Sequence, residues 1–230
     1  MPSKRYIKAK QLVEASKTYP LKSAVEVLNK FPKAKFNETV DLAFRLGVDP
    51  KHSDQMVRGT VALPHGSGKV VRVLVFAKPG SSADAAKAAG AEFVGYEDMI
   101  KKCNDGWSDF DVAVATPEAM AEVRKLGKVL GPRGLMPNPK TGTVTDDTAK
   151  AVKEVKAGRV EYKVDKAGNV HVAIGKGAFP AVQIEENARA VIEAVIKARP
   201  TSVRGVYVQS CTLSLTMSPA VRVDLKEFAT

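Results

Sequence analysis

VVRVLVFA, residues 70–77, is an almost unbroken apolar stretch that follows the turn-forming sequence PHGSGK at 64–69. A strand with one face in water alternates apolar and polar residues, whereas a strand covered by helices on both faces is apolar throughout. A second stretch of this kind, FDVAVATP, occupies residues 110–117. The two stretches predict buried parallel strands, and hence an α/β fold, in the middle of the chain.

Helical patterns alternate with these strands. Asp146 and Asp147 precede one of the helices, where an acidic side chain caps free backbone N–H groups. The repeated strand–helix units predict a small parallel sheet between two helical layers, a three-layer Rossmann-like α/β domain over residues 67–158. The expected elements are helices at 82–89, 96–103, 118–130 and 146–156, and a short strand at 92–94.

Both ends of the chain follow a different pattern, in which antiparallel strands accompany amphipathic helices. Residues 39–46 alternate apolar and polar side chains, as a half-buried strand does, and RVEYKV (159–164) and NVHVAI (169–174) predict a hairpin across DKAG. The ends therefore predict one split α+β domain, 1–66 with 159–230. Its other expected elements are helices at 4–17, 21–30 and 181–199, and strands at 57–63, 206–217 and 220–225.

The inserted domain is joined to the split domain by two chain crossings that contain glycine. Gly66 and Gly68 lie in the first crossing, and Gly158 lies in the second. Glycine permits backbone conformations that other residues avoid, and paired crossings of this kind are typical of hinges. The three glycines are therefore the predicted hinge residues.

Basic charge is concentrated in the split domain. The chain has 36 Lys and Arg residues against 25 Asp and Glu residues, a net charge of +11. The split domain carries 22 of these cations and 13 of the acids, a net of +9, whereas the inserted domain has a net of +2. This segregation predicts that the split domain faces a polyanion, and RNA is the favoured partner. Nine of the cations fall in the first 35 residues, including the candidate secondary contacts Lys4, Arg5 and Lys8.

The sequence gives no argument for catalysis, a cofactor or a bound metal. His52, His65 and His171 are scattered, without the spacing of a catalytic or metal site. GSGKV at 66–70 resembles the end of a phosphate-binding loop, but Val70 stands where the Mg²⁺-binding hydroxyl belongs and a strand is expected to follow. We therefore predict a protein that is not an enzyme. The alternative is a nucleotide-dependent enzyme that uses the Rossmann-like domain.

Targeting segments are also absent from the sequence pattern. The N-terminus lacks the apolar core of a signal peptide, and no stretch of about 18 apolar residues occurs. Cys103 and Cys211 lie in unrelated contexts, so we expect buried thiols in a reducing compartment. These features predict a cytoplasmic protein with no membrane contact.

One strand of the split domain carries a row of hydroxyl groups. In SCTLSLTM, residues 210–217, alternation places Ser210, Thr212, Ser214 and Thr216 on one face, and Cys211, Leu213, Leu215 and Met217 on the other. Short hydroxyl side chains suit RNA, whose 2′-hydroxyls and phosphates both donate or accept hydrogen bonds. The alternative is a strand that simply faces water.

Two basic segments are candidate RNA contacts. KAKFNET, residues 33–39, combines Lys33 and Lys35 with Phe36, whose ring can stack on a base or ribose. Phe36 also shares the alternation of the following apolar strand, which favours the core instead. The second segment, GPRGLMPNPKTGTV at 131–144, carries Arg133 and Lys140 and has no acid. It is either a second polyanion contact or a rigid connector.

Several segments together resemble the ribosomal large-subunit protein L-one family over essentially the whole chain. They are GPRGLMPNP, SDQMVRGTVALPHG, GWSDFDVAVATP and TMSP. The resemblance implies a hinged two-domain architecture and binding to the mobile stalk of 23S rRNA in the large ribosomal subunit. It also implies help in releasing exit-site tRNA and repression of the protein's own operon mRNA. A cytoplasmic, ribosome-associated protein that is a monomer when free is expected.

The resemblance also implies which residues bind RNA. The family's main RNA surface falls here on Lys35, Phe36 and Thr39, and on Thr216 and Met217 at the end of the hydroxyl strand. The family usually has glycine after this methionine, whereas this chain has Ser218. A side chain at that position either limits the approach of RNA to the backbone or donates a hydrogen bond to it.

Overall fold

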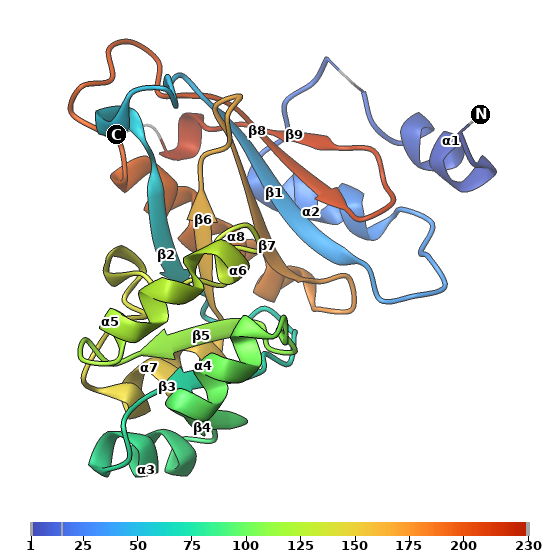
Figure 1. Ribbon diagram of the computed structural model, residues 1–230. Coiled ribbons are helices and arrows are strands. Elements are labelled where there is room, and N and C mark those ends of the chain that lie inside the picture. The colour runs from blue at the N-terminus through green and yellow to red at the C-terminus, as the bar shows by residue number, and fades with distance from the viewer. Residues whose placement is uncertain (1, 15, 229–230) are drawn as a thin grey trace. The chain divides into compact units, whose positions relative to one another are not determined.

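The described residues of the protein, 2–14 and 16–228, form a mixed α/β structure with three sheets, seen in a computed structural model (Figure 1). Contacts between residues group into two units. Met1–Gly68 with Gly158–Thr230 is called the outer unit, and Lys69–Ala157 is called the inserted unit. The α/β class expected from the sequence is confirmed.

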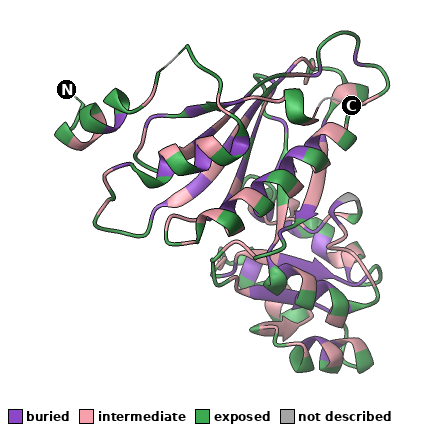
Figure 2. Cartoon of the chain, turned by 180° about the vertical axis from the view of Figure 1, so that it is seen from behind, coloured by how far each residue is buried: buried purple, intermediate pink, exposed green. Residues whose placement is uncertain are grey.

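The inserted unit contains a parallel sheet in the order β4-β3-β5, with β3 (Val73–Phe76) between β4 (Phe93–Gly95) and β5 (Val112–Ala115). Every residue of β3 is buried, as the purple strand in Figure 2 shows. The strand is shorter than the apolar stretch that predicted it, because residues 70–72 precede it. Val70 is 87% exposed.

Helices cover both faces of this sheet. Val73 and Val75 pack with α3 (Ser81–Ala88) and α7 (Thr148–Ala157). Leu74 and Phe76 pack in a separate cluster with α4 (Glu97–Asn104), α5 (Met120–Val123) and α6 (Gly127–Leu130). The unbroken apolar sequence of β3 is explained by this double coverage.

The helix predicted at 118–130 is confirmed only in part, because it begins at Met120 and is not one regular α-helix. The segment is divided into α5, a 3₁₀ turn at Arg124–Leu126 and α6. Gly127, a poor helix former, lies at the second junction. Leu126 and Leu130 are nevertheless buried, so packing keeps the three short pieces against the sheet.

The proline-rich loop after α6 is more ordered than its composition predicts. Thr143 Oγ1 accepts a hydrogen bond from the Asn138 N–H at 2.8 Å, and a 3₁₀ turn spans Pro139–Thr141. Val144 then forms a parallel bridge to Ala115 at the end of β5. The predicted acidic cap of the following helix is confirmed, because Asp147 Oδ1 accepts a hydrogen bond from the Lys150 N–H at 3.0 Å.

The outer unit is built on an antiparallel sheet in the order β7-β1-β8-β9. α2 (Leu21–Asn29) and α8 (Ala181–Lys197) pack against one face and share its apolar core. The other face is open, so the strands alternate, and β1 follows the alternation predicted from its sequence. The strands are β1 (Thr39–Leu46), β7 (Asn169–Lys176), β8 (Val208–Leu215) and β9 (Val221–Val223).

The hairpin predicted at 159–174 forms only as a turn. β6 (Arg159–Lys163) pairs with β2 (Arg58–Ala62) in a separate two-stranded sheet, whereas β7 pairs with β1. Asp165 Oδ1 accepts hydrogen bonds from backbone N–H groups within the turn. The turn is therefore stable by itself, and each flanking strand has a different partner.

The first predicted helix is too long. α1 spans Lys4–Gln11 and is capped by Ser3, whose Oγ accepts a hydrogen bond from the Tyr6 N–H. Part of the remaining prediction, residue 15, lies outside the described residues. Tyr19 bridges Val223 of β9, so the chain is extended by this point rather than helical.

Candidate nucleic-acid interface

Two segments far apart in the sequence meet at one end of β1 and β8. The Thr39 N–H donates a hydrogen bond to Thr216 Oγ1 at 2.9 Å, and the Thr216 N–H donates to the Thr39 carbonyl oxygen at 3.1 Å. Lys176 Nζ donates to Thr39 Oγ1 at 2.9 Å. The structure therefore brings together Thr39 and Thr216, two predicted RNA-binding residues.

Glu38 joins the same two segments and was not identified from the sequence. Its side chain is only 5% exposed. One carboxylate oxygen accepts a hydrogen bond from the Met217 N–H at 3.1 Å, and the other accepts one from the Ala34 N–H at 3.2 Å. Arg5 Nη2 lies 3.8 Å from the carboxylate. The only signal in the sequence is an isolated acid within a basic segment, which is too common to indicate such a role.

Phe36 and Met217 are exposed on these adjoining segments. Their exposed fractions are 54% and 56%. The alternation that favoured a core position for Phe36 is wrong, because β1 begins only at Thr39. Met217 likewise follows the end of β8 at Leu215, so the alternation of the strand does not extend to it. The interface therefore presents two large apolar side chains to solvent, beside exposed Lys35.

Ser218 uses its hydroxyl group within its own turn. Ser218 Oγ accepts a hydrogen bond from the Leu215 N–H at 2.9 Å and lies 2.9 Å from the Pro219 carbonyl oxygen, to which it donates. The hydroxyl thus closes the turn that carries Thr216 and Met217. Its residue is only partly exposed.

The hydroxyl row continues along the open face of β8. Cys211, Leu213 and Leu215 are buried, whereas Ser210, Thr212 and Ser214 are not. The predicted alternation is confirmed for these residues, and Thr216 lies beyond the strand, in the following turn. Burial raises the pKa of the Cys211 thiol to about 12, so this cysteine behaves as an apolar core residue.

The secondary candidates are distributed over both units. Lys4 and Lys8 are exposed on α1, whereas Arg5 is half-buried near Glu38. Arg133 is exposed in the inserted unit, beyond α6. The side chain of Lys140 lies outside the described part of the chain.

The predicted hinge glycines have backbone conformations that favour glycine. The φ angles of Gly66, Gly68 and Gly158 are 69°, 66° and 108°. A Cβ atom on Gly158 would lie 2.4 Å from the Gly66 Cα, so the two crossings pass directly beside each other. Asn187 of α8, which is fully buried, donates a hydrogen bond from Nδ2 to the Gly66 carbonyl oxygen at 3.0 Å.

The phosphate-loop alternative finds no support in the described residues. GSGKV leads into strand β3, whereas a phosphate-binding loop leads into a helix. Across residues 2–14 and 16–228, no three metal-ligating side chains form a cluster, and no helix has the length and apolar content to cross a bilayer.

A model of the Ribosomal protein L1p/L10e family matches residues 28–219. The chain belongs to this family. Membership makes it a structural ribosomal protein that binds rRNA, and it confirms the resemblance seen in the sequence. The matched region contains both segments that Glu38 joins and the whole inserted unit, whereas α1 and its cations precede it.

Proposed function

We propose that the outer unit binds the stalk segment of 23S rRNA through the surface formed by residues 33–39 and 215–218. The observation that carries this proposal is the buried Glu38 carboxylate, which ties the two segments together beneath exposed Phe36 and Met217. A unit with a net charge of +9 attracts RNA at long range. At the surface itself, Lys35 contacts phosphate, and Phe36 stacks on a base or ribose.

The geometry favours recognition of folded RNA rather than of any polyanion. The backbone around Thr39 and Thr216 is fixed by hydrogen bonds before RNA arrives. A surface that is already ordered loses little entropy on binding, and it discriminates by shape. Ser210, Thr212 and Ser214 extend this surface along β8 with groups that can meet 2′-hydroxyls.

The two units act as domains in this proposal, a split α+β domain and an inserted Rossmann-like domain. Gly66, Gly68 and Gly158 form the hinge between them and permit the stalk to move. Arg133 and Lys140 of the inserted domain make secondary contacts to rRNA or to exit-site tRNA, whose release the protein assists. Binding of a similar structure in its own operon mRNA would make the protein a translational repressor, and the free protein is a monomer.

The test compares two paired variants in binding to a stalk transcript at physiological salt. Phe36→Ala with Met217→Ala removes exposed side chains and leaves the hydrogen bonds of Glu38 intact. We expect a loss of at least tenfold in affinity, because stacking on one base contributes about 1–3 kcal/mol. Arg133→Ala with Lys140→Ala is expected to lose much less.

Bulk tRNA as competitor separates specific from nonspecific binding, since nonspecific binding depends mainly on salt and charge. Equal losses in the two pairs would contradict the assignment of the main site to the outer unit. Equal competition by bulk tRNA would contradict recognition of the stalk.

A further inference from the structure

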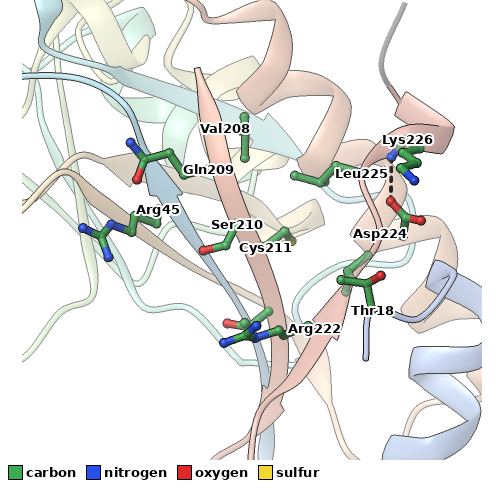
Figure 3. Close-up of a pocket in the computed structure, with 12 residues that line it drawn as sticks. Thr18, Arg45, Val208, Gln209, Ser210, Cys211, Arg222, Asp224, Leu225 and Lys226 are labelled. Carbon is green, nitrogen blue, oxygen red and sulfur yellow. Dashed lines mark hydrogen bonds between the residues drawn. The ribbon is translucent and has the colours of Figure 1, made fainter. Parts of the chain in front are cut away.

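Two arginines flank the hydroxyl row at the far end of β8 from the Thr216 turn. Arg45 of β1 lies directly opposite Ser210, and Arg222 of β9 lies directly opposite Thr212. Residues opposite each other in an antiparallel pair project from the same face. Figure 3 shows Arg45, Ser210 and Arg222 extending to one side of the sheet, with Cys211 on the other. Both arginines are exposed.

Neither arginine has an ion-pair partner among residues 2–14 and 16–228. Other arginines of the chain, such as Arg58 and Arg189, do pair with carboxylates. Arg45 and Arg222 lie on the two strands that flank β8, and their positions differ by two residues along the strand direction. Standard strand spacings then place their Cα atoms about 12 Å apart. The two positive charges repel each other at this distance, so the pair does not stabilise the folded protein.

Asp224, directly after β9, borders the same groove as the two arginines, but within the described residues it forms no ion pair with either of them. Asp224 Oδ1 accepts a hydrogen bond from the Lys226 N–H at 3.0 Å, as the dashed line in Figure 3 shows. Asp165 accepts hydrogen bonds from its own turn. Asp41 lies opposite Ser214, at the other end of the row, with His171 and Lys176 as its charged neighbours. The groove nevertheless keeps a net positive charge, because its lining contains Arg45, Arg222 and Lys226 against the single acid Asp224.

The groove runs past these side chains at the β8–β9 edge of the sheet. Its volume is about 670 Å³, and its lining includes Arg45, Ser210, Thr212 and Arg222. The rest of the lining is mixed, with Lys226, Asp224 and several apolar residues. The guanidinium and hydroxyl groups are of the kinds that contact the phosphate and sugar of nucleic acids.

We propose that Arg45 and Arg222 bind phosphates of the RNA that the Thr216 turn recognises. The inference rests on the proposed function and extends its interface along β8. Ser210 and Thr216 are six residues apart, a distance of about 20 Å along an extended strand. The interface then has two ends: a turn with apolar and hydroxyl groups, and a phosphate clamp that supplies salt-dependent affinity.

The salt dependence of binding tests this division. Affinity for a stalk transcript is measured between 50 and 200 mM salt for the wild type and for Arg45→Gln with Arg222→Gln. Each lost phosphate contact lowers the slope of log affinity against log salt by about 0.7–0.9. The double variant should therefore lose about 1.4–1.8 units of slope, and its deficit in affinity should shrink about tenfold across this range.

Matched variants separate a phosphate contact from a general effect of net charge. Arg189→Gln with Lys197→Gln removes the same two charges from α8, on the covered side of the sheet, and should leave the slope within about 0.3 of the wild type. Arg45→Lys with Arg222→Lys keeps both charges and should retain the slope. Phe36→Ala with Met217→Ala should lower affinity without changing the slope, since it removes no charge.

The outcomes are distinguishable. An unchanged slope in the Arg45→Gln, Arg222→Gln variant would contradict phosphate binding by the two arginines, whether affinity is kept or lost. The Thr216 turn would then remain as the proposed RNA site. An equal fall in slope for Arg189→Gln with Lys197→Gln also overturns the clamp, because the effect would then be one of net charge. Failure of the wild type to prefer the stalk transcript over bulk tRNA would remove the proposed function itself.

Discussion

Glu38 holds the two segments of the interface together through hydrogen bonds that a neutral amide cannot reproduce. Both carboxylate oxygens accept backbone N–H groups, whereas glutamine has one oxygen and one NH₂ group. Glu38→Gln should leave one buried N–H without an acceptor and lower the free energy of unfolding by about 1–3 kcal/mol. Affinity for the stalk transcript should fall as well, because the turn at Met217 loosens.

Denaturant unfolding measures the stability effect. Glu26→Gln, a matched change at an exposed position of α2, should alter the free energy of unfolding by less than about 0.5 kcal/mol. Equal stability of Glu38→Gln and the wild type would show that the carboxylate does not organise the surface.

Two glycines should respond to alanine in opposite directions. Gly158 has a φ of 108°, and a Cβ there would lie 2.4 Å from the Gly66 Cα, so Gly158→Ala should destabilise the protein by at least about 1–3 kcal/mol. Gly127 has a φ of −54° and open space around its Cα, so Gly127→Ala should stabilise it by about 0.5–1 kcal/mol. Thermal unfolding of both variants checks the pair, and shifts of the same sign would contradict this account.

At the scale of elements, strands and helices could be predicted wherever burial follows a regular pattern from residue to residue. β1 alternates because helices cover one face of its sheet, and β3 is apolar throughout because helices cover both. The separation of β6 from β7 was not predictable, because it depends on β2 and β1, which are distant in sequence. A local turn pattern contains no information about such partners.

The candidate site was predictable only in part, for the same reason. Thr216 was predicted from the hydroxyl row, the family resemblance implied both Thr39 and Thr216, and the pattern around Phe36 left it between the core and the surface. Phe36 is exposed because β1 begins only at Thr39. The two segments of the site are joined by the N–H groups of Ala34 and Met217, which donate hydrogen bonds to the Glu38 carboxylate. Bonds between distant segments leave no periodic signal in either one.

The starts of two neighbouring strands of the inserted unit are joined by an acid with a shifted pKa. Asp111, just before β5, accepts hydrogen bonds from Lys69 Nζ at 2.6 Å and from the Arg72 N–H at 3.1 Å, just before β3. The Lys69 hydrogen bond is the main cause that lowers the pKa of the Asp111 carboxyl to about 2. The folded state therefore favours the ionised form of this carboxyl.

Because the folded pKa lies below the unfolded value of about 3.9, Asp111 stabilises the protein fully above pH 5 and loses this effect as pH falls towards 2. Asp111→Asn should lower the free energy of unfolding by about 2 kcal/mol at pH 6, and by less than 1 kcal/mol at pH 2. Urea unfolding at both pH values measures the difference. Asp109→Asn, at a more exposed partner of Arg72, should cost under 1 kcal/mol at either pH, and a pH-independent deficit for Asp111→Asn would refute the assignment.

At the scale of the whole molecule, charge and core follow the same division. The outer unit holds 22 cations against 13 acids, and among the described residues its apolar core contains none from the inserted unit. The inserted unit has its own sheet and two cores of its own, with a net charge of only +2. Long-range attraction of RNA is therefore expected to come almost entirely from the outer unit.

Removal of residues 69–157 tests this directly. Gly66 and Gly158 already lie in contact, so a short Gly-Ser linker from Gly68 to Gly158 spans the gap without strain. The remnant should fold cooperatively, because every strand of β7-β1-β8-β9 and of β2-β6 is retained. It should also keep the salt slope of the full chain to within about 1.8 units, since the remnant keeps all 22 cations of the outer unit and loses only the two secondary contacts proposed for Arg133 and Lys140.

Circular dichroism and RNA titration of the remnant give separate answers on folding and on binding. The isolated segment 69–157 is the matched control, and its affinity for the stalk transcript should be lower by at least tenfold. A remnant that folds but does not bind the stalk transcript would show that recognition needs surfaces from both units. Since Phe36, Thr39, Thr216 and Met217 all survive in the remnant, such a result could not be attributed to a missing contact residue of the proposed site.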